Sequence, residues 1–265
     1  MLPRVSRVEG QGADYLVFAG RDLISNELFR NGVWEAHMLS LARLFFQDQD
    51  APLVLDIGAN LGAFSIPIAK ELQAIGGQVL AFEPQRIVYY QLCANIFINR
   101  LDNCVAMQQA LGSERKIIDI PEVDYSINEN IGAFSLQRNF REIHGIESAM
   151  KVQTHTVPMI RLDELDIHKS PCLIKIDVEG LEAEVLNGGR DFLRKHGYPP
   201  ILFEAWNHAW FDQGREELMA LMAELGYRVQ RLAGIEYLAQ HPQWQGSLVE
   251  LVYEGDVLKV AVRVR

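Results

Sequence analysis

The stretch PLVLDIGANLG, residues 52–62, decides the fold of this chain. A short apolar run that ends in Asp and Gly is typical of a strand buried in a parallel sheet. Gly58 permits a tight turn after that strand, and Gly62 lets the next segment approach it closely. That next segment reads as a helix, with Gly76 and Gly77 as its stop signal. The stretch therefore predicts a strand, a glycine turn and a helix in succession.

The alternation of strand and helix continues through most of the chain. Further strands are predicted at residues 78–85, 104–112, 171–180 and 199–206, and helices at 86–101, 181–197 and 216–227. Residues 228–234, 235–242 and 247–265 are expected to add antiparallel strands. Repeated strand–helix units imply an α/β fold with a doubly wound, mainly parallel sheet and helices on both faces.

Two segments stand apart from this pattern. Residues 1–50 include NELFRNGVWEAHMLSLARLFF, which reads largely as amphipathic helix. We expect residues 1–50 to form a helical extension or lid over the ligand crevice of a domain at 51–265. Residues 112–150 read as a long irregular loop, and such loops in regular α/β domains are often functional. We expect both segments to shape the ligand pocket.

The composition limits which binding partners and which cellular compartment are expected. The 265 residues carry a formal net charge of −10 and no clear cluster of Lys and Arg, so nucleic acid is not an expected partner. Cys93, Cys104 and Cys172 lack metal-ligand spacing, and the histidines show none either, so no metal site is predicted. No signal peptide or membrane-length apolar run is evident, so we expect a cytoplasmic protein that does not bind membranes. The sequence leaves the oligomeric state open, a homo-oligomer included.

Acidic residues follow the first two predicted strands, where open α/β sheets bind ligands. Asp56 precedes a glycine loop whose spacing differs from the GxGxxG of dinucleotide enzymes. An acidic residue there suits a cationic group such as the methionine part of S-adenosylmethionine. Glu83 ends the next strand and could accept hydrogen bonds from two ribose hydroxyls. The alternatives are a plain strand–helix turn for the loop and a helix N-terminal carboxylate for Glu83.

Further polar residues end the fourth and fifth predicted strands. Lys175, Asp177 and Glu179 share one face if the strand runs that far. Asp177 could contact the amine of the cofactor, act as a general base or bind a metal, and the spacing does not separate these roles. A surface ion pair of Lys175 with Glu179, together with a helix cap, is the alternative. Glu204 is expected beside Asp177, and His208 is another candidate base, although a structural histidine is the commoner case.

Taken together, these motifs resemble the FkbM family of methyltransferases. The matching segments are RDLISNELFRNGVWE, VLDIGANLGAFS, AFEP, NIGAFS, RLDEL, KIDVEGLEAEVLNGG and the FE of ILFEAW. The resemblance implies a class I methyltransferase (Rossmann-like) fold, with a seven-stranded sheet whose last strand is antiparallel. It also implies S-adenosylmethionine as cofactor and, usually, O-methylation of sugars or natural products.

The resemblance also implies roles for individual residues. The methionine part of the cofactor would be held by Asp56, Gly58, Asn60 and Gly62, and the ribose by Glu83. Ala110 and Leu111 would lie near the adenine, and Glu35 would reach the cofactor from the N-terminal segment. Asp177 and Glu179 would lie at the reaction crevice.

Methyl transfer to a hydroxyl requires loss of a proton, and this requirement frames the mechanistic hypothesis. Asp177 is the preferred base, Glu204 and His208 are alternatives, and Lys175 would stabilise developing negative charge. A second reading has Asp177 and Glu204 bind Mg²⁺, as in catechol-type O-methyltransferases. A third is a non-catalytic protein that binds S-adenosylmethionine. The acceptor itself, a small molecule, is not identified by the sequence.

Overall fold

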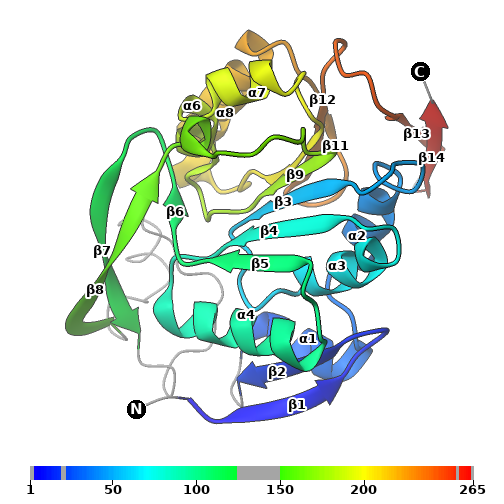
Figure 1. Ribbon diagram of the computed structural model, residues 1–265. Helices are drawn as coiled ribbons and strands as arrows, with labels where there is room; N and C mark the ends of the chain where they lie inside the picture. Colours follow the sequence, from blue (N-terminus) through cyan, green and yellow to red (C-terminus); the bar gives the residue numbers. More distant parts are fainter. Residues whose placement is uncertain (1–2, 19–21, 124–149, 255–256, 264–265) are drawn as a thin grey trace.

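A central sheet of seven strands organises the computed structural model, which describes residues 3–18, 22–123, 150–254 and 257–263 (Figure 1). Its strands are β3 (Leu53–Ile57), β4 (Gln78–Phe82), β5 (Cys104–Met107), β9 (Leu173–Ile176), β10 (Ile201–Glu204), β11 (Arg228–Arg231) and β12 (Glu236–Gln240). They lie in the order β11-β12-β10-β9-β3-β4-β5. β12 runs antiparallel to both of its neighbours, and the remaining pairs are parallel. The predicted seven-stranded, mainly parallel sheet with an antiparallel last strand is confirmed.

Helices cover both faces of the sheet, as predicted. They are α2 (Ala36–Arg43), α3 (Ser65–Gln73) and α4 (Arg86–Ile98) on one face, and α6 (Glu182–Asn187), α7 (Arg190–Lys195) and α8 (Asp212–Glu224) on the other. Successive side chains of a strand point to opposite faces. Val54 of β3 accordingly packs with α2 and α3, whereas Leu55 packs with α6 and α8. Among the described residues, no helix combines the length and apolar character needed to cross a bilayer.

The N-terminal extension is only partly helical, which corrects the expectation of a helical segment. It opens with an antiparallel hairpin of β1 (Val5–Glu9) and β2 (Asp14–Phe18), followed by α1 (Leu23–Asn31) and α2 (Figure 1). The hairpin docks on α4 through side-chain amides. Asn95 accepts a hydrogen bond from the backbone N–H of Leu16 at 2.6 Å, and Gln91 donates to its carbonyl at 2.8 Å. These side chains, distant in the sequence, pair backbone groups of β2 on the edge that faces away from β1. Local sequence patterns do not reveal such partners.

The segment expected as an irregular loop contains part of a second sheet. Strands β6 (Ala110–Leu111), β7 (Lys116–Val123) and β8 (Met150–Ile160) form a three-stranded sheet in the order β6-β8-β7. The strand predicted at 104–112 is therefore two strands, β5 and β6, in different sheets. Residues 124–149, which include the NIGAFS motif at 130–135, lie outside the described residues.

The helix predicted at 181–197 is interrupted at Gly188 and Gly189, which separate α6 from α7. A Cβ at Gly188 would lie 1.9 Å from the carbonyl oxygen of Gly112, so this close approach requires glycine. 3₁₀ turns within the described ranges lie at Leu162–Glu164 and Ala209–Phe211. The C-terminal stretch forms a separate antiparallel hairpin of β13 (Leu248–Glu254) and β14 (Val257–Arg263), which agrees with the predicted antiparallel character.

Candidate active site

A cavity of about 680 Å³ opens at the carboxyl ends of the central strands. Most of the residues predicted for the site line it. These are Glu35, Gly58, Asn60, Glu83, Ala110, Leu111, Asp177, Glu179, Glu204 and His208. Asp56, Gly62 and Lys175 are not in the lining; they lie behind it and support the loops that form the wall. The sheet thus brings together strand ends that are far apart in the chain.

The glycine loop between β3 and α3 forms one side of the cavity. Gly58 has a φ of 87°, and a Cβ there would lie 1.8 Å from the carbonyl oxygen of Asp177. Only glycine allows this contact with the end of β9. Asn60 is also left-handed, with a φ of 51°, and its Oδ1 accepts the N–H of Leu61 at 2.7 Å. Gly62 packs its backbone against side chains of α3 and α4.

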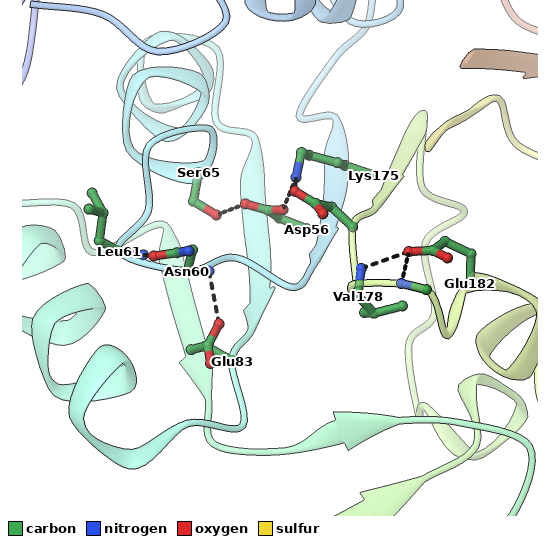
Figure 2. Close-up of polar contacts among 10 residues, drawn as sticks. Asp56, Asn60, Leu61, Ser65, Glu83, Lys175, Val178 and Glu182 are labelled. Atoms are coloured by element: carbon green, nitrogen blue, oxygen red, sulfur yellow. Dashed lines mark hydrogen bonds and ion pairs between the residues drawn. The ribbon is translucent and has the colours of Figure 1, made fainter. Parts of the chain in front are cut away.

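Glu83 is fixed next to this loop at the end of β4 (Figure 2). One carboxylate oxygen accepts the N–H of Asn60 at 3.0 Å, and the other accepts the N–H of Gln85 at 2.8 Å. Burial raises the pKa of Glu83 to about 7, and the two backbone N–H groups oppose that rise. Glu83 thus precedes α4, as the alternative reading expected, and it also faces the cavity.

A buried ammonium group lies between two carboxylates beneath the cavity wall (Figure 2). Lys175 Nζ donates to Asp177 Oδ2 at 2.9 Å and lies 4.0 Å from Asp56 Oδ1. Asp56 and Lys175 are paired in register on the adjacent strands β3 and β9. Asp56 is fully buried; its Oδ2 accepts from Ser65 at 2.5 Å, whereas its Oδ1 finds no hydrogen-bond donor among the residues that the structure describes.

The charges of this group are mutually dependent. Burial alone lowers the pKa of Lys175, but the carboxylates of Asp177, Asp56 and Glu35 outweigh it and raise that pKa overall. Burial raises the pKa of Asp56, and Lys175 and Ser65 oppose the rise. A raised pKa favours the protonated form of Lys175, whose positive charge offsets the negative charge of the buried carboxylates around it.

The strand β9 ends at Ile176, so Asp177 and Glu179 belong to a turn and not to a strand face. The shared face expected for Lys175, Asp177 and Glu179 therefore does not extend to Glu179, although Lys175 and Asp177 do meet. Glu179 has a φ of 54°, and burial raises its pKa well above the ordinary value. Glu182, at the start of α6, is 2% exposed and accepts hydrogen bonds from backbone N–H groups of this turn.

The opposite side of the cavity is formed by β10, β12 and the segment between α1 and α2. Glu204 pairs in register with Glu236 on the neighbouring strand, and His37 contacts Glu236 at 2.5 Å. Burial raises the pKa of Glu204 to about 10 and that of Glu35 to about 7. Sequence reasoning identified Glu204 and Glu35 but missed Glu236 and His37. His37 lies two residues after the GVWE motif, and this closeness to the motif is the one feature of the sequence that could have pointed to it.

Aromatic side chains complete that side. Trp34 and Trp206 line the cavity, whereas Trp210 and Phe211 pack against Trp206 with ring centroids 5.3 and 5.1 Å away. His208 lines the cavity and stacks on Trp210 with centroids 5.9 Å apart. In the described part of the chain, no three His, Cys, Asp or Glu side chains converge in an arrangement suited to a metal ion.

A doubly wound sheet with an antiparallel seventh strand, an acidic glycine loop and a carboxylate after the second strand defines a class I methyltransferase domain. The family described as "Methyltransferase FkbM domain" matches residues 56–229, which is more than half of the chain. The chain belongs to the FkbM family of S-adenosylmethionine-dependent methyltransferases. The family suggested by the sequence motifs is thus confirmed.

The chain is also similar to one curated methyltransferase and to two solved structures. Methyltransferase sdnD of Sordaria araneosa is 23% identical over 245 residues, which cover 83% of this chain and 88% of the relative. The crystal structure of methyltransferase FkbM from Methylobacillus flagellatus KT has a TM-score of 0.47 at 18% identity. That match covers 75% of this chain and 47% of the crystallised chain, so this chain spans about half of its length. The Pyrococcus abyssi tRNA (uracil-54, C5)-methyltransferase, solved with S-adenosyl-L-homocysteine, has a TM-score of 0.47 at 14% identity; the match covers 89% and 43% of the two chains.

Proposed function

We propose that this methyltransferase acts on a hydroxyl oxygen of a small acceptor, such as a sugar or a natural product. The observation that carries the proposal is the Asp177 carboxylate, which lines the cavity and is held 2.9 Å from the buried Lys175 ammonium. A carboxylate fixed in this way is suited to accept a proton from an acceptor hydroxyl. Trp34 and Trp206 add flat apolar surface against which a ring can stack.

The residues around the glycine loop fit S-adenosylmethionine. The cavity volume of about 680 Å³ lies within the range of small-molecule sites. The Glu83 carboxylate spends one acceptor position on Asn60 and one on Gln85, which leaves lone pairs for two ribose hydroxyls. We assign Gly58, Asn60 and Glu83 to cofactor contact. Ala110, Leu111, Glu35 and Glu179 line the same cavity and are further candidates.

Asp56 and Gly62 are assigned an indirect part in binding. Asp56 is fully buried, and Gly62 packs against Leu92 and Ile66, away from the cavity lining. Both residues stabilise the loop that carries Gly58 and Asn60. The carboxylates of the site also support S-adenosylmethionine as the ligand, because an acidic site favours a cofactor that carries a cationic sulfur and an ammonium group.

The chemistry is an in-line displacement at a methyl group on a cationic sulfur, which S-adenosylmethionine supplies when it is bound. With the cofactor held at Gly58, Asn60 and Glu83, its methyl group would pass to the acceptor oxygen, and the electron pair of the broken carbon–sulfur bond would stay on sulfur. Asp177 takes the proton of the acceptor hydroxyl, while the cavity walls hold that oxygen in line. Lys175 is not in the cavity lining, so we assign it to orienting Asp177 through a charge-assisted hydrogen bond.

Glu204 and His208, the other two candidates for the general base, rank below Asp177. Glu204, whose pKa burial raises to about 10, is protonated at neutral pH and is suited to donate a hydrogen bond to the acceptor. His208 stacks on Trp210 at the rim of the same cavity, and we retain it as the second choice. A general base must lie within hydrogen-bond reach of the acceptor hydroxyl. Mutation of each of the three residues tests which of them the reaction needs.

The experiment is methyl transfer from S-adenosylmethionine to a panel of methyl glycosides and simple phenols, with mass-spectrometric location of the new methyl group. We expect an O-methyl product, and we expect Asp177→Asn to lower kcat by about 100- to 10,000-fold in a folded protein. The matched control is Asp166→Asn, because Asp166 is exposed. A product methylated on a ring carbon would refute the proposal. Cofactor binding without turnover on any acceptor would favour the non-catalytic reading.

A further inference from the structure

The turn after β9 carries two cavity-lining carboxylates in an unusual backbone conformation. Asp177 and Glu179 both line the cavity, and Glu179 has a φ of 54°. The left-handed region is unfavourable for a residue with a side chain, because Cβ approaches the backbone too closely. Gly180 follows with a φ of 91°. The turn therefore needs partners elsewhere that hold it in this shape.

One end of the turn is held by the strand next to it. The N–H of Asp177 donates to the carbonyl of Ile57 at 2.9 Å, which extends the pairing of β3 and β9 by one bond. The carbonyl of Asp177 rests against the backbone of Gly58, which leaves no room for a Cβ. These contacts hold the start of the turn, and its continuation through Val178, Glu179 and Gly180 needs another partner.

The other end of the turn is held by Glu182 (Figure 2). Its Oε1 accepts the N–H of Val178 at 3.1 Å and the N–H of Gly180 at 3.2 Å. These two N–H groups flank Glu179, so one carboxylate oxygen bridges the left-handed residue from both sides. Glu182 is 2% exposed, and its side chain does not line the cavity. Its contribution to the site therefore passes through the turn.

We propose that Glu182 is a positioning residue, whose carboxylate holds the turn at 177–180 so that Asp177 meets Lys175 and faces the cavity. The catalytic consequence rests on the function proposed above, in which Asp177 takes the proton. A residue that only capped α6 would contribute to stability and leave the geometry of Asp177 unchanged. Misplacing a catalytic group by about 1 Å can lower the rate about 100-fold, so the two roles differ measurably.

The test compares three variants of the full chain. Glu182→Gln keeps an oxygen that can accept both backbone N–H groups, whereas Glu182→Leu has similar size and no acceptor. Glu184→Leu is the control, because Glu184 lies on the same helix and is exposed. Each variant is crystallised with S-adenosylhomocysteine, titrated with it by calorimetry and assayed for kcat on the best acceptor of the panel.

We expect Glu182→Leu to lose the contact between Lys175 and Asp177 and to lower kcat about 100-fold, while the Kd for S-adenosylhomocysteine changes less than about threefold. Glu182→Gln should keep that contact and most of the activity, and Glu184→Leu should match the wild type. Should the leucine variant fail to fold, Glu182→Asp, which retracts the carboxylate by one methylene, replaces it with the same expectations.

Two results would overturn the inference: a folded Glu182→Leu with an unchanged turn and kcat, or a Glu182→Gln as impaired as the leucine variant. Failure of the proposed function looks different. In that case the wild type binds S-adenosylhomocysteine but methylates no hydroxyl acceptor. The crystal structures then still decide whether Glu182 positions Asp177 against Lys175.

Discussion

Lys175 and Asp177 form an ion pair of 2.9 Å at the carboxyl end of β9, and the same Lys175 ammonium lies 4.0 Å from the fully buried Asp56. The arrangement depends on the charge of one ammonium group. Two carboxylates on adjacent strand ends are compensated by a lysine that is itself 8% exposed. Removing one partner of such a buried group leaves uncompensated charge, which is costly.

Lys175→Met should therefore lower the free energy of unfolding by about 3–5 kcal/mol. Urea denaturation at neutral pH measures the change. Lys70→Met serves as the control, because Lys70 is exposed on α3 and the substitution should cost less than about 0.5 kcal/mol. Equal stability of the two variants would show that Lys175 does not compensate the buried carboxylates.

Glu83→Gln should weaken the binding of S-adenosylmethionine and S-adenosylhomocysteine. The amide keeps the shape of the side chain but loses the charge, and hydrogen bonds to charged groups contribute about 1.5–3 kcal/mol each. We expect the Kd in calorimetric titration to rise by a factor of about 10 or more, and Glu83→Ala to abolish binding. Glu114→Gln, on an exposed side chain, is the matched control, and NAD should not bind to any of the proteins. An unchanged Kd in Glu83→Gln would remove Glu83 from the cofactor site.

Gly58→Ala and Gly12→Ala separate a steric clash from backbone strain. The two glycines have nearly the same φ, 87° and 85°. A Cβ at Gly58 would lie 1.8 Å from the Asp177 carbonyl oxygen, whereas a Cβ at Gly12 would have no atom of the described residues within 4 Å. Gly12→Ala should cost about 1–2 kcal/mol from strain alone. Gly58→Ala should cost more in thermal or urea unfolding, and should also abolish cofactor binding. Comparable losses of stability in the two variants would argue against the close packing of the two loops.

The stability of the free protein should fall as the pH rises from about 5 to 8. Burial raises the pKa of Glu83, Glu35 and Glu182 to about 7 and that of Glu204 to about 10, all above the unfolded value. A raised pKa means that the folded state binds more protons, so the stabilisation is complete below the unfolded pKa and is lost as the pH rises through the folded pKa.

Glu204→Gln tests one of these contributions directly. At pH 8 the Glu204 carboxylate must take up a proton when the chain folds, whereas the amide of the variant needs none, so the variant should be more stable than the wild type by about 1–3 kcal/mol at pH 8 and by less at pH 5. Chemical denaturation at the two pH values gives the comparison. Glu217→Gln, which changes an exposed side chain of α8, should show no such difference. A wild type that gains stability between pH 5 and 8 would contradict the burial argument.

Treatment with a chelator distinguishes methyl transfer with Asp177 as the general base from methyl transfer assisted by Mg²⁺. With Asp177 as the base, methyl transfer to the best acceptor should be unchanged after treatment with EDTA and removal of the chelator. Loss of activity that Mg²⁺ restores would instead support a metal held by Asp177 and Glu204. The measurement is the initial rate before chelation, after chelation and after addition of Mg²⁺, with cofactor binding as the control for intact protein.

Much of the site was predictable because its residues occupy positions that local patterns reveal. Glu83, Asp177 and Glu204 each stand where an apolar run ends, and the carboxyl ends of parallel strands meet at one edge of the sheet. The positions of Glu236 and His37 follow from a different cause. β12 inserts between β10 and β11, which brings Glu236 opposite Glu204. No local pattern shows which strands become neighbours.

The sequence by itself determined the class of fold, the glycine loop and the row of acidic strand ends, because the periodicity of apolar residues and the position of glycines are local properties. Only the tertiary structure decided which groups satisfy one another. Asn95 reaches the backbone of Leu16, Lys175 lies between Asp56 and Asp177, and Glu182 bridges the turn around Glu179. Buried polar groups need hydrogen-bond partners. Those partners are often far away in the sequence and become neighbours only when the chain has folded.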